Sequence, residues 1–249
     1  MTSHRLAGRR VLVTRAMEDS QRWATQLAAH GADPVLLPCV RSEPLDDNVT
    51  RAQLASACRD AEWLLFTSVR GVDAVARTGV VLAARTRVAA VGDATAAAAR
   101  LRLSCAPFVA YGGTSHALGT ELLALWGGVS KARRVVVAGA EGGRDDAEQV
   151  LAAAGARVTR VNVYRTLPAS PVSPRRDLGQ EGIDDVLLAS PSAVTGLLNQ
   201  ALVGASTRCF TIGPTTSAAA RSVGLVVTGE SATPDLNGLM EAMQCTIGA

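Results

Sequence analysis

The chain has 249 residues, of which 48% are hydrophobic, and a net charge of +3 that is spread along its length. It has no dense basic and aromatic clusters, which argues against nucleic-acid binding. Its five cysteines, none with CxxC spacing, argue against a disulfide framework or a structural zinc site, and no apolar run reaches the roughly 18 residues of a membrane span. We therefore expect a soluble cytoplasmic protein that binds neither membrane nor nucleic acid.

Predicted strands and helices alternate along the whole chain. The predicted strands are 11–14, 34–40, 63–68, 87–92, 107–111, 134–138, 157–164, 185–190, 209–213 and 225–228. The predicted helices are 18–30, 69–77, 94–101, 115–126, 145–154, 192–199, 215–223 and 236–243. Each strand is a continuous Val, Leu and Ile run, which is typical of parallel sheets covered by helices on both faces. The predicted fold class is α/β, with ten strands in two parallel five-stranded sheets.

Part of the chain occurs twice. Residues 9–40 begin RRVLV and residues 133–166 begin RRVVV, and the two segments align at a constant offset of 124. A second pair aligns LLFTS at 64–68 with VLLAS at 186–190, at an offset of 122. The pattern indicates that one α/β unit was duplicated within the chain.

Two polar stretches that contain proline, 41–48 and 167–182, read as linkers. Both fall inside a copy of the repeat instead of between the copies. The middle of the chain, 42–165, then forms one domain, and the two ends, 1–38 plus 169–249, together form the other. A cleft between two such domains is a common place for a ligand.

Small and hydroxyl-bearing residues follow the predicted strands at six junctions. In parallel α/β sheets, the edge formed by the carboxyl ends of the strands presents free amide N–H groups of helix N-termini, which favour anions. The sequence therefore predicts a polyanionic ligand held mainly by neutral donors, although such residues also serve as ordinary helix caps and turns. The candidate binding residues are Thr14, Arg15, Thr67, Ser68, Gly92, Thr95, Gly139, Ser190, Ser192, Gly213 and Thr216.

Several common sites have no signature here. The sequence lacks a GxxxxGK[ST] loop, a GxGxxG turn after the first strand and a GxSxG elbow, so nucleotide, dinucleotide and serine-nucleophile sites are not indicated. His4, His30 and His116 stand apart from any carboxylate or cysteine at ligand spacing, and we predict no metal site. If the protein is an enzyme, its chemistry needs little from side chains.

Six segments, taken in order, resemble the uroporphyrinogen-III synthase family. They are VLVTR (11–15), FTSVRGV (66–72), AVGDATA (90–96), GGRDDAEQVLAAAGARVTRVNVYRT (142–166), LLASPSAV (187–194) and IGPTTSAAARSVGL (212–225). The chain departs from the family pattern near the end of RRVVVAG, where a basic residue is expected and Ala138 and Gly139 stand.

The resemblance implies two flavodoxin-like domains joined by a two-stranded linker, about 39–41 and 166–168, with the active site between them and no cofactor. It also implies the reaction. Linear hydroxymethylbilane loses water, its ring D is inverted through a spiro intermediate, and uroporphyrinogen III forms in tetrapyrrole (heme) biosynthesis. The substrate carries an acetate and a propionate on each of its four rings, which suits the donor-rich junctions.

Loss of the hydroxyl creates a reactive azafulvene, which closes without help to the uninverted isomer. The main task of the enzyme is therefore to hold the linear tetrapyrrole in a curled geometry. Tyr164 is the candidate proton donor to the departing hydroxyl, and Arg15 and Arg70 are candidates to pair with carboxylates. A tyrosine at a strand end is also often a packed aromatic. A second hypothesis is a non-catalytic two-lobed tetrapyrrole-binding or regulatory module of the same fold. We expect a monomer, since the cleft can form within one chain.

Overall fold

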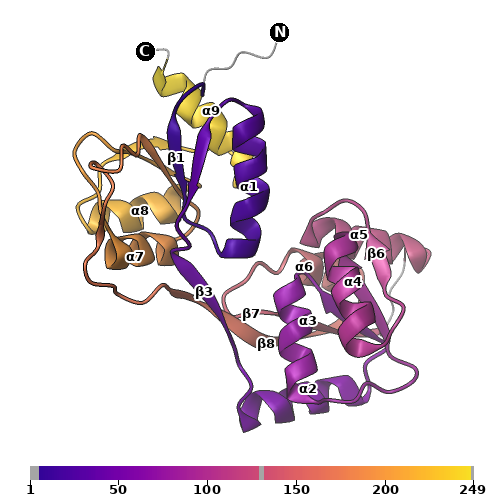
Figure 1. Cartoon of the computed structure of the whole chain (residues 1–249). Helices are drawn as coiled ribbons and strands as arrows, with labels where there is room; N and C mark the ends of the chain where they lie inside the picture. The colour runs from indigo at the N-terminus through magenta and orange to yellow at the C-terminus, as the bar shows by residue number, and fades with distance from the viewer. Residues whose placement is uncertain (1–5, 129–131, 248–249) are drawn as a thin grey trace. The chain divides into compact units, whose positions relative to one another are not determined.

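The structure is a computed structural model that describes residues 6–128 and 132–247. The chain divides into two compact units, which we call unit 1 (Met1–Arg41 with Thr166–Ala249) and unit 2 (Ser42–Arg165). Figure 1 traces the elements of each unit along the chain. Within the described ranges, no helix is long and apolar enough to cross a membrane.

Unit 1 is built on a five-stranded sheet in the order β13-β12-β10-β1-β2, in which all neighbours run parallel. Leu12 lies at its centre, paired with Val186 on one side and Val35 on the other. The strands are β1 (Arg10–Val13), β2 (Asp33–Leu36), β10 (Asp185–Leu188), β12 (Arg208–Thr211) and β13 (Val227–Glu230).

Helices cover both faces of this sheet. The helices are α1 (Met17–Ala29), α7 (Pro191–Gln200), α8 (Pro214–Ser222) and α9 (Leu236–Ile247). Val11 and Val13 of β1 pack with the α1 and α9 side chains, whereas Leu12 between them packs with α7 and α8. Because successive strand residues point to opposite faces, a strand buried on both faces must be apolar throughout. A short parallel ladder of β9 (Arg176–Asp177) and β11 (Ala201–Leu202) lies outside the main sheet.

The sheet of unit 2 has six strands in the order β3-β8-β7-β4-β5-β6. They are β3 (Val40–Pro44), β4 (Trp63–Phe66), β5 (Arg87–Val91), β6 (Phe108–Ala110), β7 (Arg134–Ala140) and β8 (Arg157–Pro168). The strands from β8 to β6 are parallel. β3 is antiparallel to β8. Leu45 N donates to Val163 O, and Ala169 N donates to Cys39 O, so the residue number falls in one segment as it rises in the other.

Helices cover the two faces of the unit 2 sheet. α2 (Asn48–Arg59), α3 (Val69–Thr78) and α4 (Gly92–Leu103) pack on the face that contains Phe66 and Ala138. α5 (Ser115–Leu125) and α6 (Asp146–Ala153) pack on the opposite face, with Leu65 and Val137. The result is a mostly parallel sheet between two helical layers.

The structure corrects several details predicted from the sequence. Unit 2 has six strands instead of five, because residues 40–44 form β3 where a linker was predicted. At a sheet edge, one side of the backbone needs no partner, so polar residues and Pro44 are tolerated and the apolar strand pattern is missing. Likewise β9 lies within the predicted linker 167–182, and the predicted strand 34–40 ends at Leu36. Helix α2 was not predicted.

Candidate functional site

The predicted functional residues of unit 2 gather at one edge of its sheet. Ser68 follows β4, Gly139 lies near the end of β7, and Tyr164 lies in β8. Since β8, β7 and β4 are parallel neighbours, their carboxyl ends meet at the same edge. Residues far apart in sequence are therefore brought together by strand order.

At this edge the Tyr164 hydroxyl is hydrogen-bonded to Ser68, with 3.1 Å between Oη and Oγ. Tyr164 is only 6% exposed and its ring belongs to the core under α2, α3 and α4. The Arg70 guanidinium carbon stands 5.9 Å from the centre of the ring. Tyr164 is therefore both a packed aromatic and part of a polar pair.

A bulge in β8 turns the Tyr164 side chain toward Ser68. The register changes between Gly139 and Ala140 of β7, so that Ala140 pairs with Tyr164 and Val163 is the additional residue. The extra residue reverses the alternation of faces, and Val163 and Tyr164 are both buried against the same helices. Without the bulge, Tyr164 would point to the other face of the sheet. Strand β8 also continues to Pro168 beyond the predicted end at Tyr164.

Gly71 brings the start of α3 close to the sheet. A Cβ on Gly71 would lie 3.0 Å from the Ala138 carbonyl oxygen, so a larger residue would push the helix away. Ser68 is the N-cap of α3, and its Oγ accepts a hydrogen bond from Gly71 N at 3.2 Å. The close approach and the cap together hold Ser68 within reach of Tyr164.

The other candidates in unit 2 differ in how open they are. Gly92 begins α4 with φ of +70°, and a Cβ there would meet nothing within 4 Å. Thr67 is half-buried. Thr95 is 5% exposed and Gly139 is buried, so neither presents much surface to a ligand.

In unit 1 the candidates follow β1, β10 and β12, which are neighbours with one shared carboxyl edge. Ser190 caps α7 by accepting a hydrogen bond from Ala193 N at 3.1 Å, and Gly213 precedes α8 with open space beside it. Ser192 is half-buried. Two groups are internal: the buried Thr14 hydroxyl donates to Leu187 O at 2.6 Å, and Thr216 is also buried.

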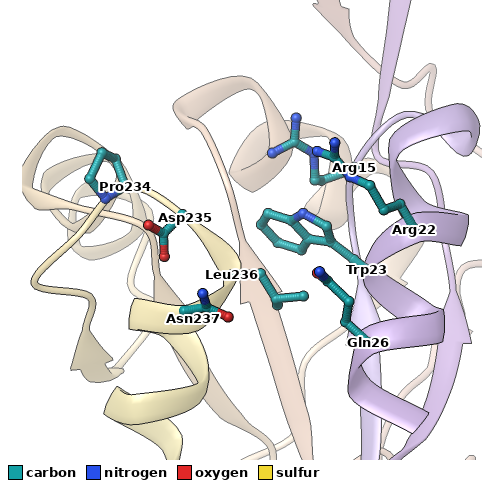
Figure 2. A pocket seen from close by; sticks show the side chains of 8 residues that line it. All are labelled: Arg15, Arg22, Trp23, Gln26, Pro234, Asp235, Leu236 and Asn237. Atoms are coloured by element: carbon teal, nitrogen blue, oxygen red, sulfur yellow. The ribbon is translucent and has the colours of Figure 1, made fainter. Parts of the chain in front are cut away.

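Arg15 faces a pocket of about 290 Å³ in unit 1. The pocket is lined by Arg15, Arg22, Trp23, Gln26, Pro234, Asp235, Leu236 and Asn237. Figure 2 shows Arg15 and Arg22 on the α1 side, across from Asp235 and Asn237 at the start of α9. The Arg15 guanidinium lies 4.7 Å from the centre of the Trp23 ring and pairs with Asp19 at 3.1 Å. The pocket lining therefore contains two arginines and one carboxylate, Asp235, while Asp19 pairs with Arg15 outside the lining.

The described part of the chain contains no group of three or more side chains suited to a metal ion. His30 Nδ1 lies 2.8 Å from the Gln26 carbonyl oxygen of its own helix, and His4 lies outside the described residues. Burial raises the pKa of Cys39 to about 12 and that of Cys209 to about 11. These thiols are therefore protonated near neutral pH and are not activated nucleophiles.

A family model described as uroporphyrinogen-III synthase HemD matches residues 21–241. The chain belongs to the uroporphyrinogen-III synthase family. A curated relative, the porphyrin biosynthesis protein HemD of Ruminiclostridium josui, is 28% identical over 170 residues, or 65% of this chain and 32% of the relative. The chain thus spans about a third of the length of that relative.

The chain is similar to solved structures from two organisms. The crystal structure of uroporphyrinogen-III synthetase from Helicobacter pylori has a TM-score of 0.52 at 16% identity, covering 96% of this chain and 99% of that chain. A mutant uroporphyrinogen III synthase from Thermus thermophilus has a TM-score of 0.49 at 18% identity, covering 97% and 99%. The Helicobacter pylori likeness supports an α/β fold with mostly parallel sheets.

Where the pattern of the uroporphyrinogen-III synthase family led us to expect a basic residue in β7, the guanidinium of Arg160 reaches over from β8. A Cβ on Gly139 would lie 2.9 Å from Arg160 Nη2, which donates to Ala140 O at 2.9 Å. The same guanidinium pairs with Glu148 of α6. Arg160 thus holds the loop between β7 and α6, a role that the sequence did not reveal because its partners lie on other elements.

Proposed function

We propose that this chain is a uroporphyrinogen-III synthase, which cyclises hydroxymethylbilane to uroporphyrinogen III with loss of water and inversion of ring D. The observation that carries the proposal is family membership across residues 21–241. The carboxyl-end edges of the two sheets support it, because they present helix N-termini and hydroxyl groups suited to the carboxylates of the substrate. The reaction belongs to tetrapyrrole (heme) biosynthesis.

Within this proposal, Tyr164 is the catalytic residue and donates a proton to the departing hydroxyl. The half-buried residues Thr67, Ser190, Ser192 and Gly213, together with Gly92, are the groups most open to substrate carboxylates. The buried candidates Thr14, Thr95, Gly139 and Thr216 would shape the pocket from beneath. Arg15 would meet a carboxylate only by sharing its guanidinium with Asp19.

We further propose that the units correspond to two flavodoxin-like domains, 1–38 plus 169–249 and 42–165, which arose by duplication and are joined by linkers at about 39–41 and 166–168. Strand order supports this. If β7 corresponds to β1 and β8 to β2, then the orders β2-β1-β10-β12-β13 and β8-β7-β4-β5-β6 are equivalent. β3 is then an addition to the second copy, contributed by the linker.

The proposed enzyme works as a cytoplasmic monomer without a cofactor or metal ion. Its chemistry requires only a proton donor and a shaped site, because the azafulvene formed by loss of the hydroxyl reacts without further activation. Sedimentation equilibrium of the purified chain tests the monomer, and a dimer at micromolar concentration would contradict it.

The decisive experiment supplies the purified protein with freshly generated hydroxymethylbilane, oxidises the products and separates the porphyrin isomers by chromatography. Predominantly isomer III establishes the activity, and a reaction without protein sets the level of spontaneous isomer I. Isomer I alone, at the rate of the control, would refute the enzyme. Tight binding of uroporphyrinogen III without turnover would then favour the non-catalytic module.

A further inference from the structure

The pocket beside Arg15 begins at the carboxyl edge of the unit 1 sheet. Arg15 comes shortly after the end of β1, and the opposite wall, residues 234–237, comes shortly after the end of β13. Because β1 and β13 belong to one parallel sheet, both segments leave the sheet at the same edge. The pocket therefore lies between the first half of α1 and the start of α9 (Figure 2).

The carboxylate in the pocket wall is already engaged within the protein. Asp235 Oδ1 accepts hydrogen bonds from Gly238 N at 2.9 Å and from Thr233 Oγ1 at 3.1 Å. Asp235 therefore caps the start of α9, and the positive end of that helix offsets part of its charge.

The two arginines of the pocket keep most of their hydrogen-bond donors. A guanidinium has five N–H groups. Arg15 uses one of them to bond Asp19 at 3.1 Å, and its guanidinium is held 4.7 Å from the centre of the Trp23 ring. Arg22 is exposed, and no hydrogen bond or ion pair of its guanidinium is found within the described ranges. Arginine binds a carboxylate well because two parallel N–H groups match its two oxygens.

The floor of the pocket is apolar and its rim is polar. Trp23 and Leu236 are 3% and 4% exposed and belong to one core cluster. The amide side chains of Gln26 and Asn237 are exposed at the rim. Sites for drug-sized ligands measure about 300–1,000 Å³, so this pocket of about 290 Å³ has room for one substituted ring and not for four. Its chemistry suits a flat apolar ring that carries a carboxylate.

We propose that this pocket binds one pyrrole ring of the linear tetrapyrrole, with Arg22 as the main partner of a carboxylate on that ring. Arg15 contributes its remaining N–H groups, and the ring packs against Trp23. The inference rests on the proposed function. It adds a residue inside a helix to candidates that all follow strands. By fixing one ring, the subsite contributes to the curled geometry that the reaction requires.

Arg22→Gln tests the subsite in the intact protein. Glutamine has no positive charge and cannot form two parallel N–H bonds to a carboxylate in the manner of a guanidinium. A contact made equally in the bound substrate and in the transition state affects KM and leaves kcat unchanged. We therefore expect the KM for hydroxymethylbilane to rise about 10-fold, with kcat within about 2-fold of wild type. Since Arg22 is exposed, the melting temperature should stay that of wild type.

Arg221→Gln is the matched control for the loss of one positive charge. Arg221 is also an exposed helical arginine of unit 1, but it lies in the last turn of α8, which packs on the other face of the sheet. Its KM should be within about 2-fold of wild type. Equal rises in KM for Arg22→Gln and Arg221→Gln would show that net charge alone attracts the substrate, and would overturn the subsite.

Binding of a single-ring probe examines the pocket without turnover. The probe is 4-methylpyrrole-3-propionate, and tryptophan fluorescence is the readout. Trp23 lines this pocket, whereas Trp63 and Trp126 belong to unit 2. We expect saturable quenching that is lost in Trp23→Phe, is about 10-fold weaker in affinity in Arg22→Gln, and is absent with the methyl ester of the probe. Equal quenching by the ester, or full displacement by an equal concentration of inorganic phosphate, would refute recognition of a ring that carries a carboxylate.

The failure of this inference and that of the proposed function give different results. If wild type makes isomer III and Arg22→Gln keeps the wild-type KM, the subsite fails alone. If wild type makes only isomer I, the proposed enzyme fails. Probe binding that requires Arg22 would then assign the pocket to the non-catalytic module, and absence of probe binding would refute the pocket as well.

Discussion

Of the glycines in the described residues, Gly196 in α7 has the least room for a side chain. A Cβ there would lie 1.7 Å from the Cys39 carbonyl oxygen and 2.7 Å from its carbonyl carbon. Ordinary contacts begin near 3.4 Å, so Gly196→Ala forces α7 and the backbone at Cys39 apart by more than an ångström. The same oxygen accepts a hydrogen bond from Ala169 N at 2.8 Å, and Gln200 Nε2 donates to Pro38 O at 2.8 Å. Both bonds would be stretched.

The magnitude follows from three contributions. Overpacking costs about 3 kcal/mol at the upper end of its usual range. Weakening the two hydrogen bonds adds about 1 kcal/mol. Replacing glycine by alanine inside a helix stabilises the folded state by about 1 kcal/mol, because alanine has the higher helix propensity. We therefore expect Gly196→Ala to lower the free energy of unfolding by about 3 kcal/mol, measured by urea titration with circular dichroism.

Gly119 in α5 provides the matched control. It is also a buried helix-interior glycine, but its Cβ would meet Ala147 and Val150 at 3.1 Å, a clash that small shifts relieve. Gly119→Ala should therefore change the free energy of unfolding by about 1 kcal/mol or less, since the helix gain offsets most of the strain. Equal stabilities for Gly196→Ala and wild type would refute the close approach of α7 to Cys39.

Three further predictions concern the site and the core. Tyr164→Phe should lower kcat by about 100-fold, whereas Tyr111→Phe, at an 81% exposed tyrosine, should not; unchanged turnover in Tyr164→Phe would remove the proton-donor role. Asp185 is fully buried and accepts hydrogen bonds from Arg9 Nη2 at 3.0 Å and Arg208 Nε at 2.8 Å. Asp185→Ala should therefore lower the free energy of unfolding, measured by urea titration, by about 3–5 kcal/mol. Asp33→Ala, which breaks an exposed ion pair with Arg10, should lower the free energy of unfolding by at most about 1 kcal/mol. Similar losses for Asp33→Ala and Asp185→Ala would contradict the role of burial. Burial raises the pKa of Cys39 to about 12, and those of Cys58 and Cys209 to about 11, from usual values near 9.0. The unfolded chain therefore ionises first, so stability is fully present below pH 9.0 and falls as the pH rises toward 11 to 12. A urea midpoint that is the same at pH 8.5 and pH 10.5 would count against this burial.

The sequence pattern was sufficient to predict a strand wherever burial on both faces requires apolar residues. Strands β1 and β4, with VLV and WLLF, are covered on both faces, and only apolar residues satisfy that position. It failed at β3 and α2. β3 is an edge strand with the polar sequence VRSEP, and α2 buries only Thr50, Leu54 and Cys58, so neither shows a strong apolar period.

By itself the sequence determined the α/β class and the family resemblance, and it predicted a repeat and binding residues after the strands, because these depend on local composition and order. Tertiary structure alone decided how those residues meet. Tyr164 and Ser68 are 96 residues apart in sequence, but their strands β8 and β4 both lie next to β7. Their side chains meet because the bulge at Val163 turns Tyr164 to the face of Ser68, and because Gly71 lets α3 approach the sheet. Strand order, bulges and close backbone contacts are long-range properties, so local residue patterns do not encode them.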